Sequence, residues 1–353
     1  MKRRTFLPIL ASPLAAQTKA PEVAAKQPPP DAKGSDVKAS EAGAIKVSVN
    51  EVIVPVTVTD SFDRFVSDLE EKDFQIFEEG KQQKIIYFNR ERSQPVVVGF
   101  LIDVSNANRL HWKTFQDASV DLIQTLLPGE KKYSGYLISY GTDAELQVNT
   151  HYDPEKMMEK VRKLKPGGGA ALYDAIYMAC TSRDLVKGEP IEPRRIIVVV
   201  GDGHDTASKK TLDEVLELAQ RNLVTIYGVS TTAFGFAADG EKTLERLAKE
   251  TGGRVEYPLN KNLYKEISGY LSTPSDEGNY ALKVGTGGYA SEIAKGMFQS
   301  IAKVAGEITT QYIMRYIPAE TDSAKVFRNI DVKVNLPNVR VRARKGYYPS
   351  TPR

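Results

Sequence analysis

The sequence predicts an α/β domain with a doubly wound, mainly parallel sheet, and an accessory β-sandwich built from strands that flank this domain in the chain. Residues 94–271 alternate short apolar runs with amphipathic helical segments, which is the pattern of a parallel sheet covered by helices. Residues 43–93 and 311–349 instead alternate apolar and polar side chains with a period of two, as half-buried strands do.

The N-terminal residues are expected to precede the fold. Residues 1–16 have a basic start, an apolar run and small residues at Ala15 and Ala16, which is typical of a secretory signal peptide. The stretch from Arg3 to Leu7 also resembles the twin-arginine export motif. Residues 17–42 are rich in Ala, Pro, Lys and Ser, so we expect a solvated tether. The sequence therefore predicts an exported protein that is periplasmic, envelope-associated or secreted.

The N-terminal β segment is expected to span residues 43–93. Residues 45–60 alternate with many β-branched side chains and predict one or two strands. Pro55 within this stretch indicates a sheet edge or a bulge, because proline cannot donate to the ladder. Residues 74–77 and 85–88 predict two further short strands.

The α/β domain is expected to span residues 94–271. The run at 96–102 is almost continuously apolar, as expected for a strand buried on both faces. The other predicted strands cover residues 133–140, 146–148, 196–200, 223–229 and 255–259. The predicted helices cover residues 112–127, 154–164, 170–185, 211–220 and 244–250.

The remaining chain predicts a return to β structure. Residues 272–289 are rich in Ser, Pro, Gly and Asp and are expected to form a loop or insertion. Residues 290–310 are expected to form one helix with an apolar face. Residues 311–349 form the C-terminal β segment, with strands predicted at 312–316 and 330–334.

Three arginines close to the C-terminus alternate along a predicted strand. They are Arg340, Arg342 and Arg344. This spacing places them on one face, and we expect an exposed sheet edge protected by charge.

Composition excludes several classes of function. The formal charge is +3 over 353 residues, and the three basic residues of the predicted signal account for all of it, which argues against a nucleic-acid partner. One cysteine rules out an intramolecular disulfide and a cysteine-based metal cluster. No internal stretch approaches the roughly 18 apolar residues of a membrane span, so we expect no integral span after signal cleavage.

Polar residues follow the predicted strands where each strand ends. They are Asp103, Ser105, Asn106 and Asn108 after the first strand of the α/β domain, Gly168 and Gly169 in a glycine-rich loop, and Asp202 and His204 after the most apolar strand. Ligands of open α/β sheets bind outside the carboxyl ends of the strands, so these residues are the candidate partner-binding set. Carboxylate and hydroxyl oxygens suit a hard divalent cation.

The order of these segments resembles a von Willebrand factor A (VWA) domain. The match covers about residues 95–270 and includes Asp103 with Ser105, the stretch 168–176, and Asp202 with Gly203. The flanking β segments are similar to those of the VWFA-related domain proteins that are abundant in acidobacteria. The resemblance implies a metal-ion-dependent adhesion site with Asp103, Ser105 and Asp202 as metal ligands.

Two positions depart from the pattern of the family. Ala107 and Ala170 stand where the resemblance implies hydroxyl ligands, and a methyl group offers no lone pair. The site is therefore expected to be degenerate and to bind Mg²⁺ or Mn²⁺ weakly or not at all.

These observations favour a non-enzymatic module that binds a protein or cell-envelope partner at the strand-end crevice. Two alternatives remain open. One is a structural envelope protein in which the crevice is unused. The other is an exported metal-dependent hydrolase that uses the same carboxylates. A further catalytic arrangement would have Ser105 as nucleophile and His204 as general base.

Overall fold

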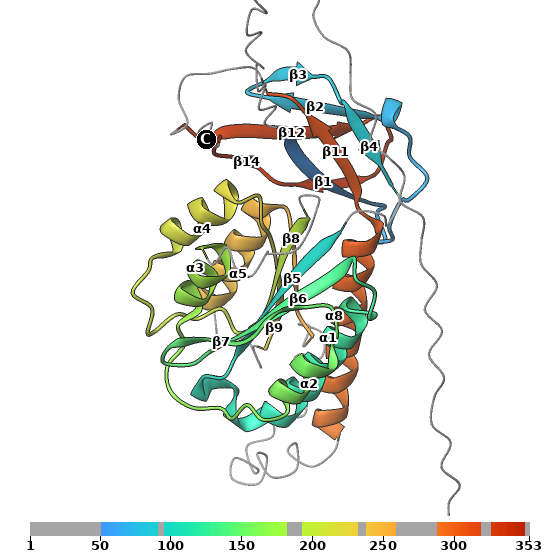
Figure 1. Ribbon diagram of the computed structural model, residues 1–353. Coiled ribbons are helices and arrows are strands. Elements are labelled where there is room, and N and C mark those ends of the chain that lie inside the picture. The colour runs from blue at the N-terminus through green and yellow to red at the C-terminus, as the bar shows by residue number, and fades with distance from the viewer. Residues whose placement is uncertain are drawn as a thin grey trace, which may run out of the picture. The chain divides into compact units, whose positions relative to one another are not determined.

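The computed structural model describes residues 51–90, 95–181, 193–231, 238–258, 288–318 and 326–349 (Figure 1). The predicted signal peptide and tether lie outside the described residues, as do the start of the N-terminal β segment and most of the predicted loop at 272–289.

The described residues form one central sheet of six strands in the order β10-β9-β8-β5-β6-β7. These strands are β5 (Val96–Asp103), β6 (Tyr133–Tyr140), β7 (Ala144–His151), β8 (Arg194–Gly201), β9 (Thr225–Ser230) and β10 (Val255–Glu256). Neighbouring strands are parallel except for β6 and β7, which are antiparallel. The predicted mainly parallel sheet is confirmed.

Strand β5 is the topological switch point of this sheet. It lies between β6 and β8, so the chain leaves β5 to build the sheet first on one side and then on the other. Every residue of β5 is buried, as its continuous apolar run predicts. In a sheet of this kind the ligand crevice opens at the carboxyl end of the switch-point strand.

Helices cover both faces of the sheet (Figure 1). One apolar core contains residues of α1 (Trp112–Leu126), α2 (Glu155–Val161) and α8 (Gly288–Thr310). The other contains residues of α3 (Leu172–Thr181), α4 (Leu212–Arg221) and α5 (Ala238–Thr251). Alternate residues of β5 enter the two cores, which makes this strand the centre of the domain.

Two four-stranded antiparallel sheets form the accessory unit. One has the order β13-β1-β11-β4, with β1 (Val52–Thr59), β4 (Tyr87–Asn89), β11 (Tyr312–Tyr316) and β13 (Arg340–Ala343). The other has the order β14-β12-β2-β3, with β2 (Phe74–Glu78), β3 (Lys81–Gln83), β12 (Arg328–Val334) and β14 (Gly346–Tyr347). Both sheets contribute to a single apolar core, and each combines strands from both flanks of the α/β domain, as predicted.

Strand β3, which forms a hairpin with β2 through Glu79 and Gly80, is absent from the sequence prediction. Glu79 and Gly80 both have positive φ, at 49° and 74°, as a two-residue type I′ turn requires. Glu78 pairs with Lys81 across this turn. Strand β3 is short and polar, so it carries no apolar period, and the strand predicted at 85–88 is reduced to Tyr87–Asn89.

Pro55 lies in an inner strand rather than in an edge strand. Strand β1 pairs with β11 over Val52–Val56 and with β13 over Val56–Thr59. Pro55 therefore lies in the half of β1 that pairs with β11 alone. As at a sheet edge, one side of the strand has no neighbour at this position, so the missing N–H of proline is tolerated.

The prediction of an exposed arginine edge is wrong for two of the three arginines. Strand β13 is an edge strand and Arg340 is exposed, but Arg344 is buried and donates to the Leu223 carbonyl at 3.0 Å. Burial lowers the pKa of Arg344 to about 10. Arg342 donates to the Glu307 carboxylate at 2.6 Å.

Glu307 joins the sandwich to the α/β domain. It is fully buried on α8 and accepts a hydrogen bond from the Thr57 hydroxyl of β1 at 3.0 Å. Arg342 of β13 and Arg254, which precedes β10, pair with the same carboxylate. Arg254 also pairs with Asp63 at 3.0 Å. This charge network connects α8 and the start of β10 to the sandwich.

Candidate functional site

The predicted crevice corresponds to the edge of the sheet where the carboxyl ends of β6, β5 and β8 meet. Asp103, the last residue of β5, is the register partner of Tyr140, the last residue of β6. Ile102 pairs with Val200 on the other side, so Gly201 ends β8 beside Asp103. Register neighbours in parallel strands point to the same side of the sheet, so positions 140, 103 and 201 form one row.

The loop after β5 is bonded to the glycine-rich loop. The Asn106 N–H donates to the Gly168 carbonyl at 3.1 Å, and the Gly167 N–H donates to the Val104 carbonyl at 2.6 Å. Gly168 has φ of +82°, and a Cβ there would overlap the Thr142 side chain, so only glycine fits at this position.

The glycine-rich loop is bonded in turn to the loop after β8. The Ala170 N–H donates to Thr206 Oγ1 at 2.9 Å, and the Thr206 N–H returns to the Ala170 carbonyl at 2.8 Å. Asp205 Oδ2 accepts from the Tyr173 N–H at 2.9 Å. The three loops therefore form one continuous rim, on which Asn106, Ala107 and Gly168 are exposed.

Two oxygens at the base of the crevice have no hydrogen-bond partner among the described residues. They are Asp103 Oδ2 and Ser105 Oγ, on side chains that are 1% and 3% exposed. The other Asp103 oxygen, Oδ1, accepts from the Ser105 N–H at 2.8 Å. Asn108 is buried and donates to the Asp103 carbonyl at 3.2 Å, so its amide holds the loop.

The Asp103 carboxyl is a weaker acid than an ordinary aspartate. Burial raises its pKa to about 7, against the hydrogen bond from the Ser105 N–H, and the neighbouring Asp202 carboxylate raises it further. Burial and the neighbouring negative charge thus favour the protonated acid, and a cation beside Asp103 would favour the carboxylate instead.

Both carboxylate oxygens of Asp202 face His204. Oδ1 accepts from the His204 N–H at 2.9 Å, and Oδ2 lies 3.1 Å from His204 Nδ1. Ser105 Oγ has no partner in the described part of the chain, so His204 is not positioned to activate it. This geometry disfavours Ser105 as a nucleophile activated by His204.

Tyr140 belongs to the site although the sequence analysis did not select it. Its side chain is fully buried, and its hydroxyl has no hydrogen-bond partner among the described residues. A Cβ added to Gly201 would overlap this hydroxyl and would lie 3.1 Å from Asp103 Oδ2. Burial, together with the carboxylates of Asp103 and Asp202, raises the pKa of Tyr140 well above its usual value, so it is a neutral hydroxyl. The available signal was Gly201, a residue without a side chain at the end of the most apolar strand.

The donor set fits a hard cation only in part. In the described ranges no three His, Cys, Asp or Glu side chains gather in a way that would hold a metal ion. The oxygens free to bind a cation are Asp103 Oδ2 and Ser105 Oγ, since Asp202 is engaged by His204. Ala107 and Ala170 add none.

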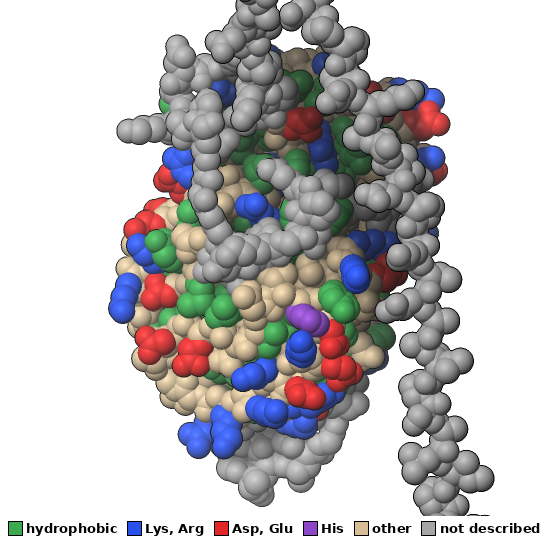
Figure 2. Space-filling model, in the orientation of Figure 1, with side chains coloured by type: hydrophobic (Ala, Val, Ile, Leu, Met, Phe, Trp, Pro, Cys, Tyr) green, Lys and Arg blue, Asp and Glu red, His purple; other side chains and the backbone are tan. Residues whose placement is uncertain are grey.

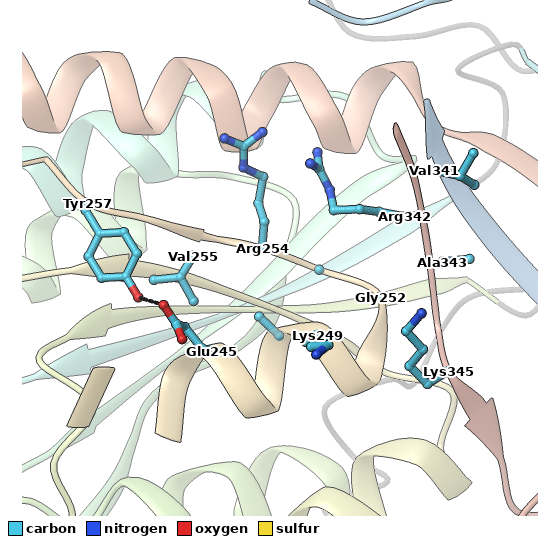
Figure 3. A pocket seen from close by; sticks show the side chains of 12 residues that line it. Glu245, Lys249, Gly252, Arg254, Val255, Tyr257, Val341, Arg342, Ala343 and Lys345 are labelled. Carbon is cyan, nitrogen blue, oxygen red and sulfur yellow. Dashed lines mark hydrogen bonds between the residues drawn. The ribbon is translucent and has the colours of Figure 1, made fainter. Parts of the chain in front are cut away.

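A second cavity of about 380 Å³ lies between α5, β10 and β13 (Figure 3). Arg254 and Arg342 line it but extend toward α8, where they pair with Glu307. The Tyr257 hydroxyl donates to Glu245 at 2.9 Å at the other end. The charges of both arginines thus serve the interface between the two parts of the fold.

The described surface carries mixed charge. On the face shown in Figure 2, basic and acidic side chains are interspersed over the α/β domain. In the part of the chain that the structure describes, no helix is long and apolar enough to cross a membrane.

The switch-point strand of this doubly wound sheet ends at Asp103, and Ser105 follows in the next loop. This arrangement defines the protein as a doubly wound α/β domain. Residues 98–267 match the family model of the von Willebrand factor type A domain. The chain therefore contains a VWA domain, and the predicted resemblance is confirmed at this level. No curated protein matches the chain.

Solved structures with a similar fold come from several bacteria. A serine-substituted aerotolerance-related membrane protein from Bacteroides fragilis is 19% identical, with 50% of this chain and 97% of that chain covered and a TM-score of 0.37. BatB from Bacteroides thetaiotaomicron is 19% identical, and the match covers 58% of this chain and 100% of that chain with a TM-score of 0.35. The vWF domain of the type V pili tip protein Mfa5 from Porphyromonas gingivalis is 13% identical. This match covers 52% of this chain and 98% of that chain with a TM-score of 0.40.

Proposed function

We propose that this protein is an exported, non-enzymatic interaction module that binds a protein or cell-envelope partner at the crevice, with weak or lost dependence on a divalent metal. The observation that carries the proposal is the pair of unpaired, buried oxygens on Asp103 and Ser105 beneath an exposed rim. Buried polar atoms are normally satisfied, so unpaired ones at a strand-end crevice mark a place for a ligand.

The rim suits contact with a macromolecule. Three loops from different strand ends are tied together by backbone hydrogen bonds, which gives a preorganised surface. Asn106, Ala107 and Gly168 are small and exposed, and so leave room for a partner's side chain. Gly169, Asp202 and His204 complete the proposed contact set.

Any metal dependence would be borne by the same crevice. Asp103 and Ser105 would hold Mg²⁺ or Mn²⁺, with Asp202 alongside, and the ion would offer an open position to an oxygen of the partner. Since Ala107 and Ala170 contribute no oxygen, partner binding by the rim itself carries most of the affinity in this proposal.

Site-specific photo-crosslinking tests the proposal. A photoreactive residue at exposed Asn106 is expected to capture a defined partner in the cell envelope, and the same probe at exposed Lys333 on β12 serves as the control. Asp202→Ala should reduce capture through Asn106 about tenfold or more, because it removes the carboxylate that orders the loop after β8. Asp331→Ala, an exposed acidic position on the sandwich, is the matched control and should leave capture unchanged.

Equal capture by the wild type and Asp202→Ala would show that the crevice is unused and would favour a structural role in the envelope.

Export is tested separately. Arg3→Lys with Arg4→Lys should retain the precursor in the cytoplasm if the twin-arginine route is used.

A further inference from the structure

The cavity between α5, β10 and β13 contains two lysines whose charges are not neutralised. Its volume of about 380 Å³ is typical of a small-ligand pocket. Lys249 lies on α5 and Lys345 follows β13, so the α/β domain and the sandwich each contribute one lysine (Figure 3). Neither ammonium group forms an ion pair with a described residue.

The acidic residue closest to Lys249 along α5 is engaged elsewhere. Glu245 precedes Lys249 by four residues, the spacing at which a glutamate and a lysine commonly pair on a helix. Its carboxylate instead accepts a hydrogen bond from the Tyr257 hydroxyl at 2.9 Å, at the other end of the cavity. The Lys249 charge is therefore left for another partner.

The same holds for Lys345 on the sandwich side. Its N–H donates to the Glu250 carbonyl at 3.4 Å, which joins this part of the chain to the end of α5. The Glu250 carboxylate pairs with Arg246 at 3.0 Å and is not available to the lysine. Two positive charges, one from each wall, thus lack an acidic partner in the described part of the chain.

The two arginines of the cavity fix its walls rather than add to this charge. Arg254 and Arg342 extend out of the cavity toward α8 and pair with Glu307 (Figure 3). Because one of them precedes β10 and the other lies on β13, both walls are tied to a single buried carboxylate. The cavity is therefore preorganised, which lowers the cost of ordering it around a ligand.

The remaining lining is apolar side chain and glycine backbone. It consists of Ala248, Gly252, Gly253, Val255, Val341 and Ala343. A charge beside such walls is screened less than a charge on an open surface, so an anion held there is attracted more strongly.

The geometry points to a binding site for a small organic anion. Its carboxylate or phosphate group lies between the Lys249 and Lys345 ammonium groups, and its apolar body packs against the valine and alanine side chains. The site adjoins the start of β10, which is parallel to β9, so it lies at the opposite edge of the sheet from the strand-end crevice. It is a second site and does not depend on the proposed function.

The test is the binding of three fluorescent naphthalene probes to the full chain: 1-naphthoate, 1-naphthyl phosphate and the neutral 1-naphthamide. At least one anion should bind at one site per chain and about tenfold or more tightly than the amide, because only an anion is attracted by both lysines. The naphthoate and phosphate arms identify the preferred head group.

Lys249→Gln with Lys345→Gln should weaken anion binding about tenfold or more. The matched control is Lys242→Gln with Lys333→Gln, which likewise removes one exposed lysine from α5 and one from the sandwich and should bind as the wild type does. Ala343→Leu fills the cavity from β13 without changing its charge and should also weaken anion binding. Circular dichroism confirms that each variant is folded.

Equal affinities of the two double variants would overturn the role of the lysines, as would equal binding of the amide and both anions. Unchanged binding by Ala343→Leu would place the anion outside the cavity, and absence of anion binding to the wild type would overturn the site altogether. None of these results bears on crosslinking through Asn106, which reports on the crevice at the other edge of the sheet.

Discussion

The Tyr140 hydroxyl occupies the space that a side chain on Gly201 would require. The two residues end strands on opposite sides of β5, and Asp103 lies between them. The Tyr140 hydroxyl therefore leaves no room for a side chain at position 201, and a larger residue there would displace the hydroxyl.

Gly201→Ala should destabilise the wild type by about 1–3 kcal/mol, because the new methyl group overlaps the Tyr140 hydroxyl. In a Tyr140→Phe background the same substitution should cost less, with a coupling energy of about 1 kcal/mol. Urea denaturation of the four proteins in chelator measures the cycle. Additive free energies would contradict the contact.

The stability of the metal-free protein should depend on Asp103 between about pH 4 and 7. Burial raises the pKa of this carboxyl to about 7, above the unfolded value of about 3.9. The native state binds more protons than the unfolded state between these values, so its stability falls as pH rises through this window. Asp103→Asn should abolish this pH-dependent loss of stability, which is on the order of 3 kcal/mol over the whole range. Parallel pH curves for the wild type and Asp103→Asn, with Asp331→Asn as control, would rule this out.

Removal of the Glu307 carboxylate should strongly destabilise the fold. Glu307→Ala leaves the positive charges of Arg342 and Arg254 without this buried partner and should cost about 3–5 kcal/mol. The control is Asp239→Ala, which breaks an exposed pair with Lys242 and should change stability by less than about 1 kcal/mol. Thermal and chemical unfolding measure both. A loss as small as the control's would mean that the network contributes little.

Restoring the two missing hydroxyls should strengthen cation binding. Ala107→Ser with Ala170→Thr should raise Mn²⁺ affinity about tenfold and increase the metal-dependent rise in Tm, since binding to the native state stabilises it by mass action. Ca²⁺ titration of the same variant tests size selectivity. An unchanged Mn²⁺ affinity would indicate that the loops do not aim these positions at the site.

The α/β architecture could be predicted because its strands are buried on both faces. The continuous apolar run that forms β5 is typical of a strand buried on both faces, and its carboxyl end marks the candidate site. Asp103, Ser105 and Asp202 were identified because they follow buried strands directly, and strand order brings them together. Even so, the contrast between exposed Asn106 and buried Asn108 depends on the turn of the 3₁₀ helix Asn106–His111, which leaves no periodic signal.

Other features depended on contacts between distant parts of the chain. Tyr140 looks like an ordinary strand residue until Gly201 is placed two strands away. Arg344 looks like a surface arginine, yet its carbonyl partner Leu223 belongs to a different part of the fold. Local periodicity cannot reveal either contact, because both pair residues that are remote in sequence.

The interleaving of N- and C-terminal strands in the sandwich has a consequence for the order of folding. Thr57 and its partner Glu307 are 250 residues apart, and strand β1 has both its neighbours, β11 and β13, beyond that point. At about 5–20 residues per second, a ribosome needs roughly 10–50 s to make the intervening chain. During that time the Val-rich strand β1 has no native partner and is vulnerable to aggregation. The VWA domain can fold first and bring the two chain ends together, so that the sandwich closes last.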